Sequence, residues 1–421
     1  MRIFNGSRQA SPRALTPSSW IRSRGCAILT FALAACSGDA PEPSPAAPDG
    51  PAPWEPVAQF SAPAEAPIPL PEPPELGTAP LGASITDILE PVSEFEGVPV
   101  SVVEAKHANG RLRYRKHVLT VGEEGEVDHG PDWRWWDNGQ IRLQRIWRDG
   151  HADGPFLEWH KSGFQKGLGS FIEDLPDGLW RRWYATGEPR AVETFSRGVR
   201  DGVEFRWHKN GKFMHSKGWT MGVEDGALFQ WSQRGELLMQ GVMRGGERVG
   251  LWWEAWPDGG AKSVSSFQGG VPHGEWTEYY ASGGSRILGG YEAGLRSGRW
   301  EAWSEAGQTL AVEHFSSDLL SGARATWSET GTLMSLGDFR EGVGVGVHEE
   351  WSREGALVMR RTYDDPPGSD REERWWPSGD LRSRGLFVGG LRDGMWEARH
   401  EDGSLDPSIT GTWRAGERVS D

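Results

Sequence analysis

The chain of 421 residues contains 58 glycines and 24 tryptophans but only two cysteines. Two cysteines exclude a fold built on disulfides, and 25% charged with 11% aromatic residues exclude disorder over most of the chain. The net charge of −15 disfavours general binding to nucleic acid or to an anionic membrane. No apolar run approaches the ~18 residues of a membrane-spanning helix. Abundant glycine together with abundant tryptophan indicates a short motif repeated many times.

Residues 1–35 are predicted to be a lipoprotein signal peptide. They contain five arginines and no acid, and they end in an apolar stretch of ten residues from Cys26 to Ala35. A basic start, a short apolar core and small residues at its end are typical of a secretory signal. The last residues and Cys36 (Leu-Ala-Ala-Cys) resemble the bacterial lipobox, whose cysteine carries the lipid. An ordinary secretory cleavage site with an incidental cysteine is the alternative.

Residues 36–100 are predicted to be the lipidated Cys36 and a disordered tether. Residues 37–100 contain sixteen of the 28 prolines and eleven acids, but no lysine or arginine. Such a composition cannot bury a core and favours an extended, polyproline-like chain. Ser37 stands where an aspartate would signal inner-membrane retention in enteric bacteria, so the resemblance implies an outer-membrane lipoprotein. We expect contact with the membrane through the lipid alone, and the periplasmic or surface orientation stays open.

Residues 130–403 contain a repeat of 24 residues. A lead glycine, which we call position 0, recurs in every unit except one, where Asp370 replaces it. Position 9 is glycine in all twelve units. It stands in clusters such as Asp-Asn-Gly and Pro-Ser-Gly, which are typical of tight turns that need a positive φ at the glycine. The lead glycines are Gly130, Gly154, Gly178, Gly202, Gly226, Gly250, Gly274, Gly298, Gly322, Gly346 and Gly394.

Position 5 carries the most uniform aromatic column of the repeat. Tyr279 takes the place of tryptophan in one unit, and Ala255 and Arg399 break the column. The short aromatic segments on either side of the position 9 turn alternate, which indicates a β-hairpin in each unit. Position 5 is therefore expected to be the structural ladder that neighbouring hairpins stack together. The tryptophans of this column are Trp135, Trp159, Trp183, Trp207, Trp231, Trp303, Trp327, Trp351 and Trp375.

A lone hairpin is marginal in water, so neighbouring hairpins must stack to bury the ladder. The predicted fold class is therefore all-β, with one elongated antiparallel sheet of about twelve tandem hairpins after the tether. Residues 101–129 are expected to form a degenerate N-terminal cap repeat and residues 404–421 a C-terminal cap. Atypical end units protect the edges of an open sheet.

The segments Gly178-Leu-Trp-Arg-Arg-Trp-Tyr-Ala-Thr-Gly187 and Gly274-Glu-Trp-Thr-Glu-Tyr-Tyr-Ala-Ser-Gly283 resemble MORN-type repeats, in the bacterial variant called the YwqK antitoxin family. The resemblance covers about residues 104–421. It implies an elongated, twisted antiparallel sheet and no chemistry of its own. Members of the family are linked to protein contacts, to membrane-associated scaffolds and, by naming, to antitoxin roles.

No catalytic, cofactor or metal site is expected. The eleven histidines are spread over the repeats and form no His-x-x-x-His or cysteine-containing ligand set. Acids such as Asp153, Asp177, Asp201 and Asp225 precede the lead glycine in successive units, so we interpret them as turn residues. The chain is therefore expected not to be an enzyme, because no non-repetitive domain remains to hold an active site.

Position 2 is the predicted binding face. It lies on the opposite side of a regular strand from position 5, because side chains alternate. Its residue varies from unit to unit, and its tryptophans Trp180, Trp252, Trp276 and Trp300 form the candidate aromatic row. An exposed row of this kind suits a glycan, a peptide or a partner protein. The alternative is that both faces are packed or covered.

A second candidate binding region is the basic patch of the N-terminal cap. Five residues close together in the sequence form it, and a solvated strand face is the alternative. They are Arg111, Arg113, Arg115, Lys116 and His117.

These features favour a lipid-anchored repeat scaffold that mediates protein–protein interaction at the bacterial envelope. A module that binds cell-wall or exopolysaccharide glycan is an alternative, since aromatic hairpin repeats also occur in choline- and glucan-binding proteins, although with shorter repeats. An antitoxin or immunity partner is a further alternative, suggested only by the family name. The partner is thus an unidentified protein or glycan, and no nucleic acid is expected.

Overall fold

The computed structural model describes residues 91–122, 125–364 and 368–420. The predicted signal peptide, Cys36 and the tether up to residue 90 lie outside the described residues. The described residues belong to one compact unit.

Short strands open the described part of the chain. β1 pairs with β2 in a two-stranded ribbon, and β3 pairs with β4 to begin the main sheet. The turn between β3 and β4 has the same hydrogen bonds as the turns of the repeats, since His107 N–H donates to the Arg111 carbonyl. The strands here are β1 (Glu94–Phe95), β2 (Val98–Pro99), β3 (Ser101–Lys106), β4 (Leu112–Val121) and β5 (Gly125–Trp135).

The repeats follow as a continuous series of antiparallel strands. In two units the strand after the link is interrupted, which separates β11 from β12 and β22 from β23. The strands are β6 (Ile141–Arg148), β7 (His151–Trp159), β8 (Gln165–Ile172), β9 (Leu175–Trp183), β10 (Pro189–Ser196), β11 (Val199–Arg200), β12 (Gly202–Trp207), β13 (Phe213–Thr220), β14 (Val223–Trp231), β15 (Leu237–Arg244), β16 (Glu247–Ala255), β17 (Ala261–Gln268), β18 (Val271–Tyr279), β19 (Ser285–Glu292), β20 (Leu295–Trp303), β21 (Thr309–Ser316), β22 (Leu319–Leu320), β23 (Gly322–Trp327), β24 (Leu333–Arg340), β25 (Val343–Trp351), β26 (Leu357–Thr362), β27 (Ser369–Trp375), β28 (Leu381–Val388) and β29 (Leu391–Ala398).

The C-terminal end departs from the repeat. After β29 a loop that contains Asp406 and Ile409 precedes β30 (Gly411–Arg414), which pairs with β29, and β31 (Glu417–Ser420) pairs with β30. The link between β30 and β31 keeps the contact that links make elsewhere, because Gly416 N–H donates to the Arg392 carbonyl at 2.9 Å.

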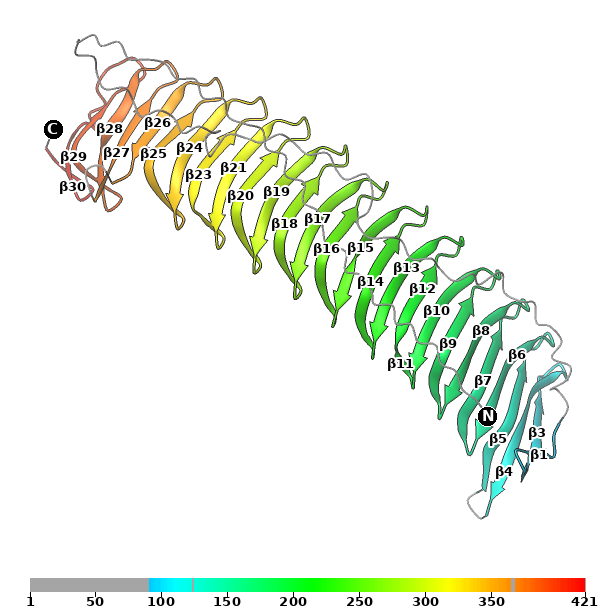
Figure 1. The fold of residues 1–421 in the computed structure, drawn as a ribbon. Coiled ribbons are helices and arrows are strands. Elements are labelled where there is room, and N and C mark those ends of the chain that lie inside the picture. The colour runs from blue at the N-terminus through cyan, green and yellow to red at the C-terminus, as the bar shows by residue number, and fades with distance from the viewer. Residues whose placement is uncertain (1–90, 123–124, 365–367, 421) are drawn as a thin grey trace, which may run out of the picture. The chain divides into compact units, whose positions relative to one another are not determined.

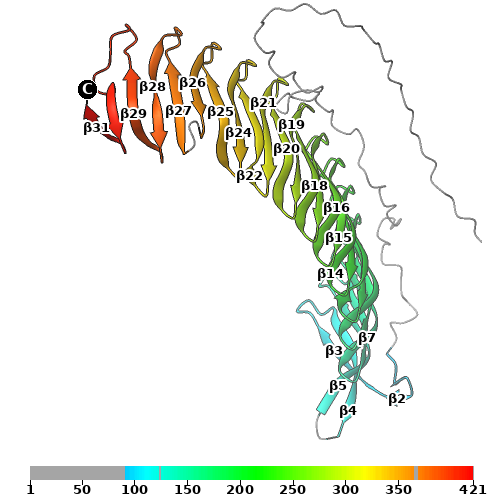
Figure 2. The same ribbon diagram turned by 60° about the vertical axis from the view of Figure 1, so that its left-hand side comes forward.

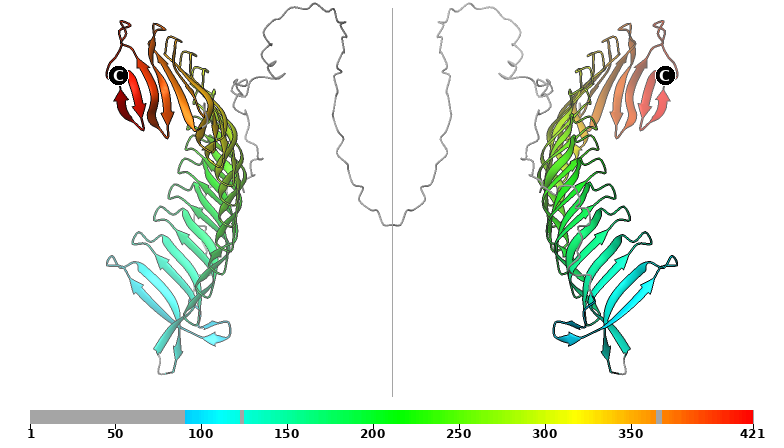
Figure 3. Two further views of the ribbon diagram at one scale, coloured as in Figure 1. Left: turned by 90° about the vertical axis from the view of Figure 1, so that its left-hand side faces the viewer. Right: turned by 90° about the vertical axis from the view of Figure 1, so that its right-hand side faces the viewer.

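The described strands form one elongated antiparallel sheet of tandem hairpins, which confirms the predicted fold class. Each strand of the sheet pairs with its neighbours in the sequence, and β3 and β31 lie at opposite ends of the row (Figure 1). The other views show a single layer whose strand direction rotates progressively from one end to the other (Figure 2, Figure 3). Both faces and both strand-end edges of this layer are therefore available for contacts.

The two kinds of connection differ in their backbone. The turn around position 9 is closed by paired hydrogen bonds, as where His160 N–H donates to the Phe164 carbonyl at 2.8 Å and Gly163 N–H donates to the His160 carbonyl at 2.9 Å. The link between repeats is a two-residue turn with positive φ at both residues, such as Asp149 (49°) and Gly150 (86°). That backbone is the type I′ turn, whose twist matches antiparallel strands.

The lead glycine lies inside a strand and not in a turn. At Gly154 the pairing register shifts between β6 and β7, and the glycine adopts a φ of 121°. This is a β-bulge, which accommodates extra residues on one strand. The unit with Asp370 in place of glycine shows no register shift between β26 and β27. Within the described repeats, the one unit that lacks the lead glycine is therefore also the one unit that lacks the bulge.

The core is spread over both faces of the layer. The face that carries positions 3 and 5, which we call the ladder face, stacks Trp207, Phe213 and Trp231 with ring centroids 5.2 and 5.6 Å apart. Where Ala255 breaks the ladder, Trp253 at position 3 is 5% exposed and packs with Tyr279. The face that carries positions 2 and 4, which we call the network face, holds the candidate functional site.

Burial of the position 5 tryptophans varies from unit to unit along the ladder. Trp159, Trp183, Trp207 and Trp303 are buried. The other ladder tryptophans are half-buried, namely Trp135, Trp231, Trp327, Trp351 and Trp375.

Candidate functional site: the network face

The candidate aromatic row lies against the sheet. Trp180 and Trp252 are 4% and 1% exposed, while Trp276 and Trp300 are half-buried. The expectation of an exposed row is therefore wrong at Trp180 and Trp252. The role of the four residues in binding stays a prediction.

A glycine on the neighbouring strand explains this burial. Position 15 of the preceding repeat is glycine beneath Trp180 and Trp252. A Cβ atom built on Gly169 would lie 2.3 Å from Cδ2 of Trp180, and one built on Gly241 would lie 2.2 Å from Cδ2 of Trp252. The missing side chain thus leaves a notch that the indole of the next repeat fills.

The aromatic row continues across the strands through residues at position 17. Trp276 lies between Phe267 and Tyr291, with ring centroids 6.2 and 5.3 Å away, and Tyr291 lies 5.0 Å from Trp300. These contacts are edge-to-face, the geometry that aromatic rings favour. The row is therefore a packed interior stripe with its outer edges half-exposed.

At two units whose position 2 is charged, an opposite charge at position 15 of the preceding repeat replaces the notch. Arg324 Nε donates to Glu313 at position 15 of the preceding repeat, at 2.9 Å. In another unit the acid is at position 2 and the base at position 15, since Oε2 of Glu372 lies 3.9 Å from Nη1 of Arg361. In these units positions 15 and 2 thus form matched pairs, whereas Glu193 and Glu204 at the same two positions are both acidic and are paired with arginines instead.

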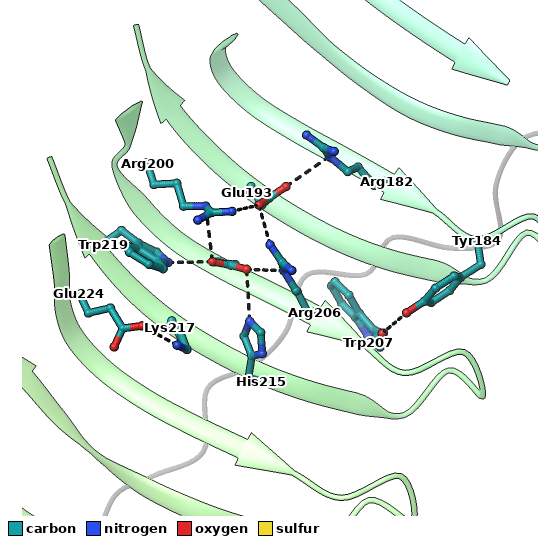
Figure 4. A network of polar contacts seen from close by, with 11 residues as sticks. Arg182, Tyr184, Glu193, Arg200, Arg206, Trp207, His215, Lys217, Trp219 and Glu224 are labelled. Atoms are coloured by element: carbon teal, nitrogen blue, oxygen red, sulfur yellow. Dashed lines mark hydrogen bonds and ion pairs between the residues drawn. The ribbon is translucent and has the colours of Figure 1, made fainter. Parts of the chain in front are cut away.

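Two buried carboxylates form the densest polar network of this face (Figure 4). Glu193 on β10 is 3% exposed. Its Oε1 accepts hydrogen bonds from Nη2 of Arg200 at 3.0 Å and from Nη2 of Arg206 at 3.1 Å. Nε of Arg182 lies 3.3 Å from Oε2. Pairing with several guanidinium groups is what permits a carboxylate to be buried.

Glu204 on β12 is the second carboxylate and is also 3% exposed. Oε2 accepts a hydrogen bond from Nε1 of Trp219 at 2.9 Å, and Oε1 lies 3.2 Å from Nε2 of His215 (Figure 4). Burial alone would raise the pKa of Glu204. The hydrogen bond from His215 and the positive charges of Arg206, His215 and Arg200 outweigh burial and lower the pKa to about 2.

A hollow of about 300 Å³ opens beside Glu193. Its lining includes the guanidinium groups of Arg182, Arg190, Arg200 and Arg206, together with Tyr184. Four arginines face two carboxylates here, so the hollow has an excess of positive charge. A planar guanidinium offers five N–H donors and suits carboxylate recognition.

The histidines at position 6 connect successive repeats. Nε2 of His160 lies 3.1 Å from the carbonyl oxygen of Trp183, and Nε2 of His208 lies 3.1 Å from that of Trp231. The hydroxyl of Tyr184 donates to the Trp207 carbonyl at 2.8 Å in the same way. We call these contacts staples. Their sequence signal is the spacing of 23 residues between donor and acceptor, which composition does not reveal.

Serine at position 6 replaces the staple with a local bond. The hydroxyl of Ser304 accepts a hydrogen bond from Gln308 N–H of its own turn at 3.1 Å, and that of Ser328 accepts one from Thr332 N–H at 3.1 Å. A serine is too short to reach the next repeat. The two classes of repeat therefore differ at the edge of the sheet where these turns lie.

The acids before the lead glycine lie in strands in several units, so their interpretation as turn residues needs correction. Asp153 lies in β7 and pairs with Arg148 at 3.1 Å. Asp177 lies in β9 and accepts a hydrogen bond from the backbone N–H of Arg197 in the following link, at 2.9 Å. Asp177 thus holds the next link turn in place, whereas Asp153 contacts the end of the preceding strand.

The basic patch of the N-terminal cap is divided between the two faces. Nε of Arg115 lies 2.6 Å from Oε1 of Glu104. Arg113 and Lys116 line a different hollow together with Trp136. His117 is fully buried, with Nδ1 2.8 Å from the Pro131 carbonyl and Nε2 accepting from Val92 N–H at 3.1 Å. The five residues are therefore not one surface.

The described residues contain no group of three or more histidine, cysteine or acidic side chains arranged to hold a metal ion. Within the same ranges, no helix is long and apolar enough to cross a membrane. What the network face offers chemically is recognition, through guanidinium groups, indoles and half-exposed aromatic edges.

No protein-family model and no curated protein matches the sequence. Solved structures with some similarity include the crystal structure of TcdB2-TccC3 without its hypervariable C-terminal region, at 9% identity and a TM-score of 0.14, covering 76% of this chain and 18% of that chain. Another is the Photorhabdus luminescens Tc holotoxin pore, at 10% identity and a TM-score of 0.13, covering 77% of this chain and 22% of that chain. This chain therefore spans about a fifth of the length of those chains. Scores this low carry no argument about function.

Proposed function

We propose that the protein is a non-enzymatic binding scaffold that engages a partner protein through the network face. The observation that carries the proposal is the arginine-lined hollow beside Glu193, where four guanidinium groups converge next to Tyr184 on an otherwise regular sheet. Arginine and tyrosine are enriched at the centres of protein interfaces. A rigid single layer held by hydrogen bonds between repeats presents such a surface with little loss of conformational entropy on binding.

We also propose that the scaffold is a lipoprotein of the bacterial envelope built from MORN-type repeats. Its support is the lipobox-like segment ending at Cys36, the proline-rich acidic tether and the 24-residue period of aromatic hairpins. Lipid on Cys36 would anchor the chain, and the tether would hold the sheet away from the membrane. Fractionation of cells that express Cys36→Ala tests this anchoring. Retention of the variant in the membrane fraction at the wild-type level would refute it.

The scaffold function is tested by a pull-down from envelope extracts with the full chain as bait. Residues 36–100 alone serve as the control for proteins that bind the tether. Enrichment of a protein by the full chain over the tether supports the proposal. If no protein is enriched over the tether control after chemical cross-linking, the proposal fails.

A glycan ligand is the second candidate, because Trp276 and Trp300 are half-buried and retain accessible edges next to Tyr291. Tryptophan and tyrosine combine a large apolar ring with a polar N–H or O–H group, which suits a ligand with both apolar and polar surface. Loss of binding on Trp276→Ala in a polysaccharide pull-down would support this candidate. Absence of binding to every cell-wall and exopolysaccharide fraction would exclude it.

A further inference from the structure

Four basic residues occupy the same position in four successive hairpins. They are the residues at position 12 of three repeats and the equivalent residue of the N-terminal cap. Each lies at or next to the bulge that follows the position 9 turn, as the register shift between Arg134 and Trp135 shows for Arg142. We call this set the basic row, and it consists of Arg113, Arg142, Lys166 and Arg190.

Three members of the basic row have no acidic partner. Arg113, Arg142 and Arg190 are exposed, and no carboxylate within the described residues forms an ion pair with any of them. Lys166 is the exception, since its Nζ lies 2.7 Å from Oε1 of Glu158. The row is therefore a line of largely uncompensated positive charge on a chain whose net charge is −15.

Aromatic residues at position 6 support the row from beneath. The guanidinium of Arg142 lies 4.7 Å from the ring centroid of Trp136, and that of Arg190 lies 5.9 Å from the ring of Tyr184. A cation over an aromatic face keeps its hydrogen-bond donors in the plane free for a ligand. The staples fix these same aromatic side chains, so the row is held in register.

The row ends one unit before position 6 changes from a staple residue to serine. Position 12 is Met214 in the next unit and Leu238 in the one after it, and position 6 of that later unit is Ser232. Basic residues return at this position only in pairs or singly, as Lys262, Arg286 and Arg382. A run of four is therefore a local feature of the N-terminal third of the sheet.

The spacing of the row matches an extended peptide that crosses the strands. Successive members are two strands apart, which places them roughly 10 Å from one another at about 4.8 Å per strand. A polyproline II chain has three residues per turn and advances about 3.1 Å per residue, so every third side chain of such an extended chain lies on one side and meets one member of the row. Nucleic acid carries charge far more densely, and the acidity of the whole chain repels it.

We propose that the basic row binds an extended acidic segment of a partner protein, with a carboxylate at every third residue. The inference rests on the proposed scaffold function and gives the chemistry of its partner. The hollow beside Glu193 adds Arg182, Arg200 and Arg206 next to the Arg190 end of the row. The row thus runs into an arginine-rich part of the network face.

Fluorescence anisotropy of labelled peptides with the full chain tests the proposal. The probe is a peptide of four Glu-Gly-Ser triplets. A peptide of four Gln-Gly-Ser triplets controls for charge, and a peptide of the same composition with its glutamates contiguous controls for spacing. The proposal expects binding of the first peptide, little binding of the second and weaker binding of the third. Equal binding of spaced and contiguous peptides would overturn it, and so would binding of the glutamine peptide.

The variant for this experiment is Arg142→Gln combined with Arg190→Gln. It should weaken binding of the spaced peptide by about threefold to tenfold, because each exposed ion pair contributes modestly. The matched control is Arg181→Gln combined with Arg197→Gln, which makes the same change of charge. Arg181 is next to Arg182 on β9 and faces the other side of the sheet, and Arg197 lies in a link. Equal weakening by this control would overturn the proposal.

The experiments distinguish failure of the scaffold function from failure of the basic row as its docking site. A protein captured by the wild-type chain and equally by Arg142→Gln/Arg190→Gln would uphold the scaffold function and overturn the basic row as its docking site. Inorganic phosphate that competes with the spaced peptide at equal charge concentration would show a general anion site and would also overturn it. Far-UV circular dichroism checks that both double variants fold, which we expect because Arg142, Arg190 and Arg197 are exposed and Arg181 is half-buried.

Discussion

The indole of Trp300 lies across the backbone of Gly289 on the neighbouring strand and donates a hydrogen bond from Nε1 to the Gly290 carbonyl at 3.1 Å. Trp396 repeats the arrangement over Gly385, with its Nε1 2.9 Å from the Leu386 carbonyl. One repeat therefore supplies the notch and the next supplies the ring. This pairing ties the sequence of each unit to that of its neighbour.

Gly289→Ala should destabilise the sheet by about 1–3 kcal/mol, because the added methyl overlaps the indole and forces Trp300 outward. A Cβ on Gly289 would lie 2.2 Å from Cδ2 of Trp300. Chemical denaturation followed by tryptophan fluorescence measures the effect. Gly284→Ala in the same hairpin is the control, since that site has open space and no positive φ. A difference below experimental error between the two variants would contradict the notch.

Deletion of one 24-residue unit should be tolerated only where the matched pairs survive. Removing residues 250–273 places Gly241 beneath Trp276, which restores a notch with its ring. Removing residues 298–321 places Gly289 beneath Arg324 and takes Glu313 away from it. Both deletions keep the period of the repeat, so nearest-neighbour contacts decide the outcome.

We expect the first of these deletions to retain a higher denaturation midpoint than the second. Thermal melts of the two purified proteins make the comparison. Equal midpoints would show that positions 15 and 2 are not coupled in stability.

Loss of stability in acid should depend on Glu204. Its pKa in the folded protein is about 2, below the ordinary value of 4.5 for a glutamate, so ionised Glu204 stabilises the fold above about pH 4.5. That contribution disappears as the pH falls from 4.5 towards 2. The stability gap between wild type and Glu204→Gln should therefore shrink by on the order of 3 kcal/mol over this range.

Denaturation midpoints measured at several pH values test this dependence. Glu329→Gln is the control for removal of a charge, because Glu329 is exposed and no ion pair involves it within the described residues. A gap between wild type and Glu204→Gln that is constant with pH would refute the role of Glu204.

Tyr184→Phe should cost about 1 kcal/mol, since it removes one neutral hydrogen bond between repeats and little else. The bond runs from the Tyr184 hydroxyl to the Trp207 carbonyl over 2.8 Å. Tyr291→Phe is the control, because the described residues include no hydrogen-bond partner for that hydroxyl. Hydrogen exchange at the turn that follows Trp207 should quicken in the first variant alone.

The sequence predicts the sheet because the period determines it. Gly163 and its equivalents require turns, and Trp183 and its equivalents require a stacked ladder, so an unbroken spacing leaves only tandem hairpins. The sequence does not predict the bulge at the lead glycine, since a bulge at Gly154 depends on how two strands pair. A pattern along one strand does not report the register of the other.

The network face was less predictable than the ladder face. The exposure of Trp252 depends on Gly241, eleven residues earlier in the sequence and opposite it on the next strand. Likewise the burial of Glu204 depends on arginines from different strands that converge only in the folded sheet. Reading positions 15 and 2 as a pair would reveal the notch, because glycine at position 15 accompanies an indole at position 2, but it would not reveal the burial of Glu204, whose partner at position 15 is the acid Glu193.

The staples all point the same way along the chain, from position 6 of one repeat to the carbonyl of the next. Nε2 of His160 lies within hydrogen-bond distance of the Trp183 carbonyl, and the Tyr184 hydroxyl donates to the Trp207 carbonyl. A chain that is synthesised from its N-terminus completes each of these bonds only after the acceptor residue of the following repeat has been made. Assembly of the sheet therefore has a direction. Truncation from the N-terminus removes a donor and leaves the carbonyl of the following repeat without it. Truncation from the C-terminus removes the carbonyl and leaves the donor at position 6 without an acceptor.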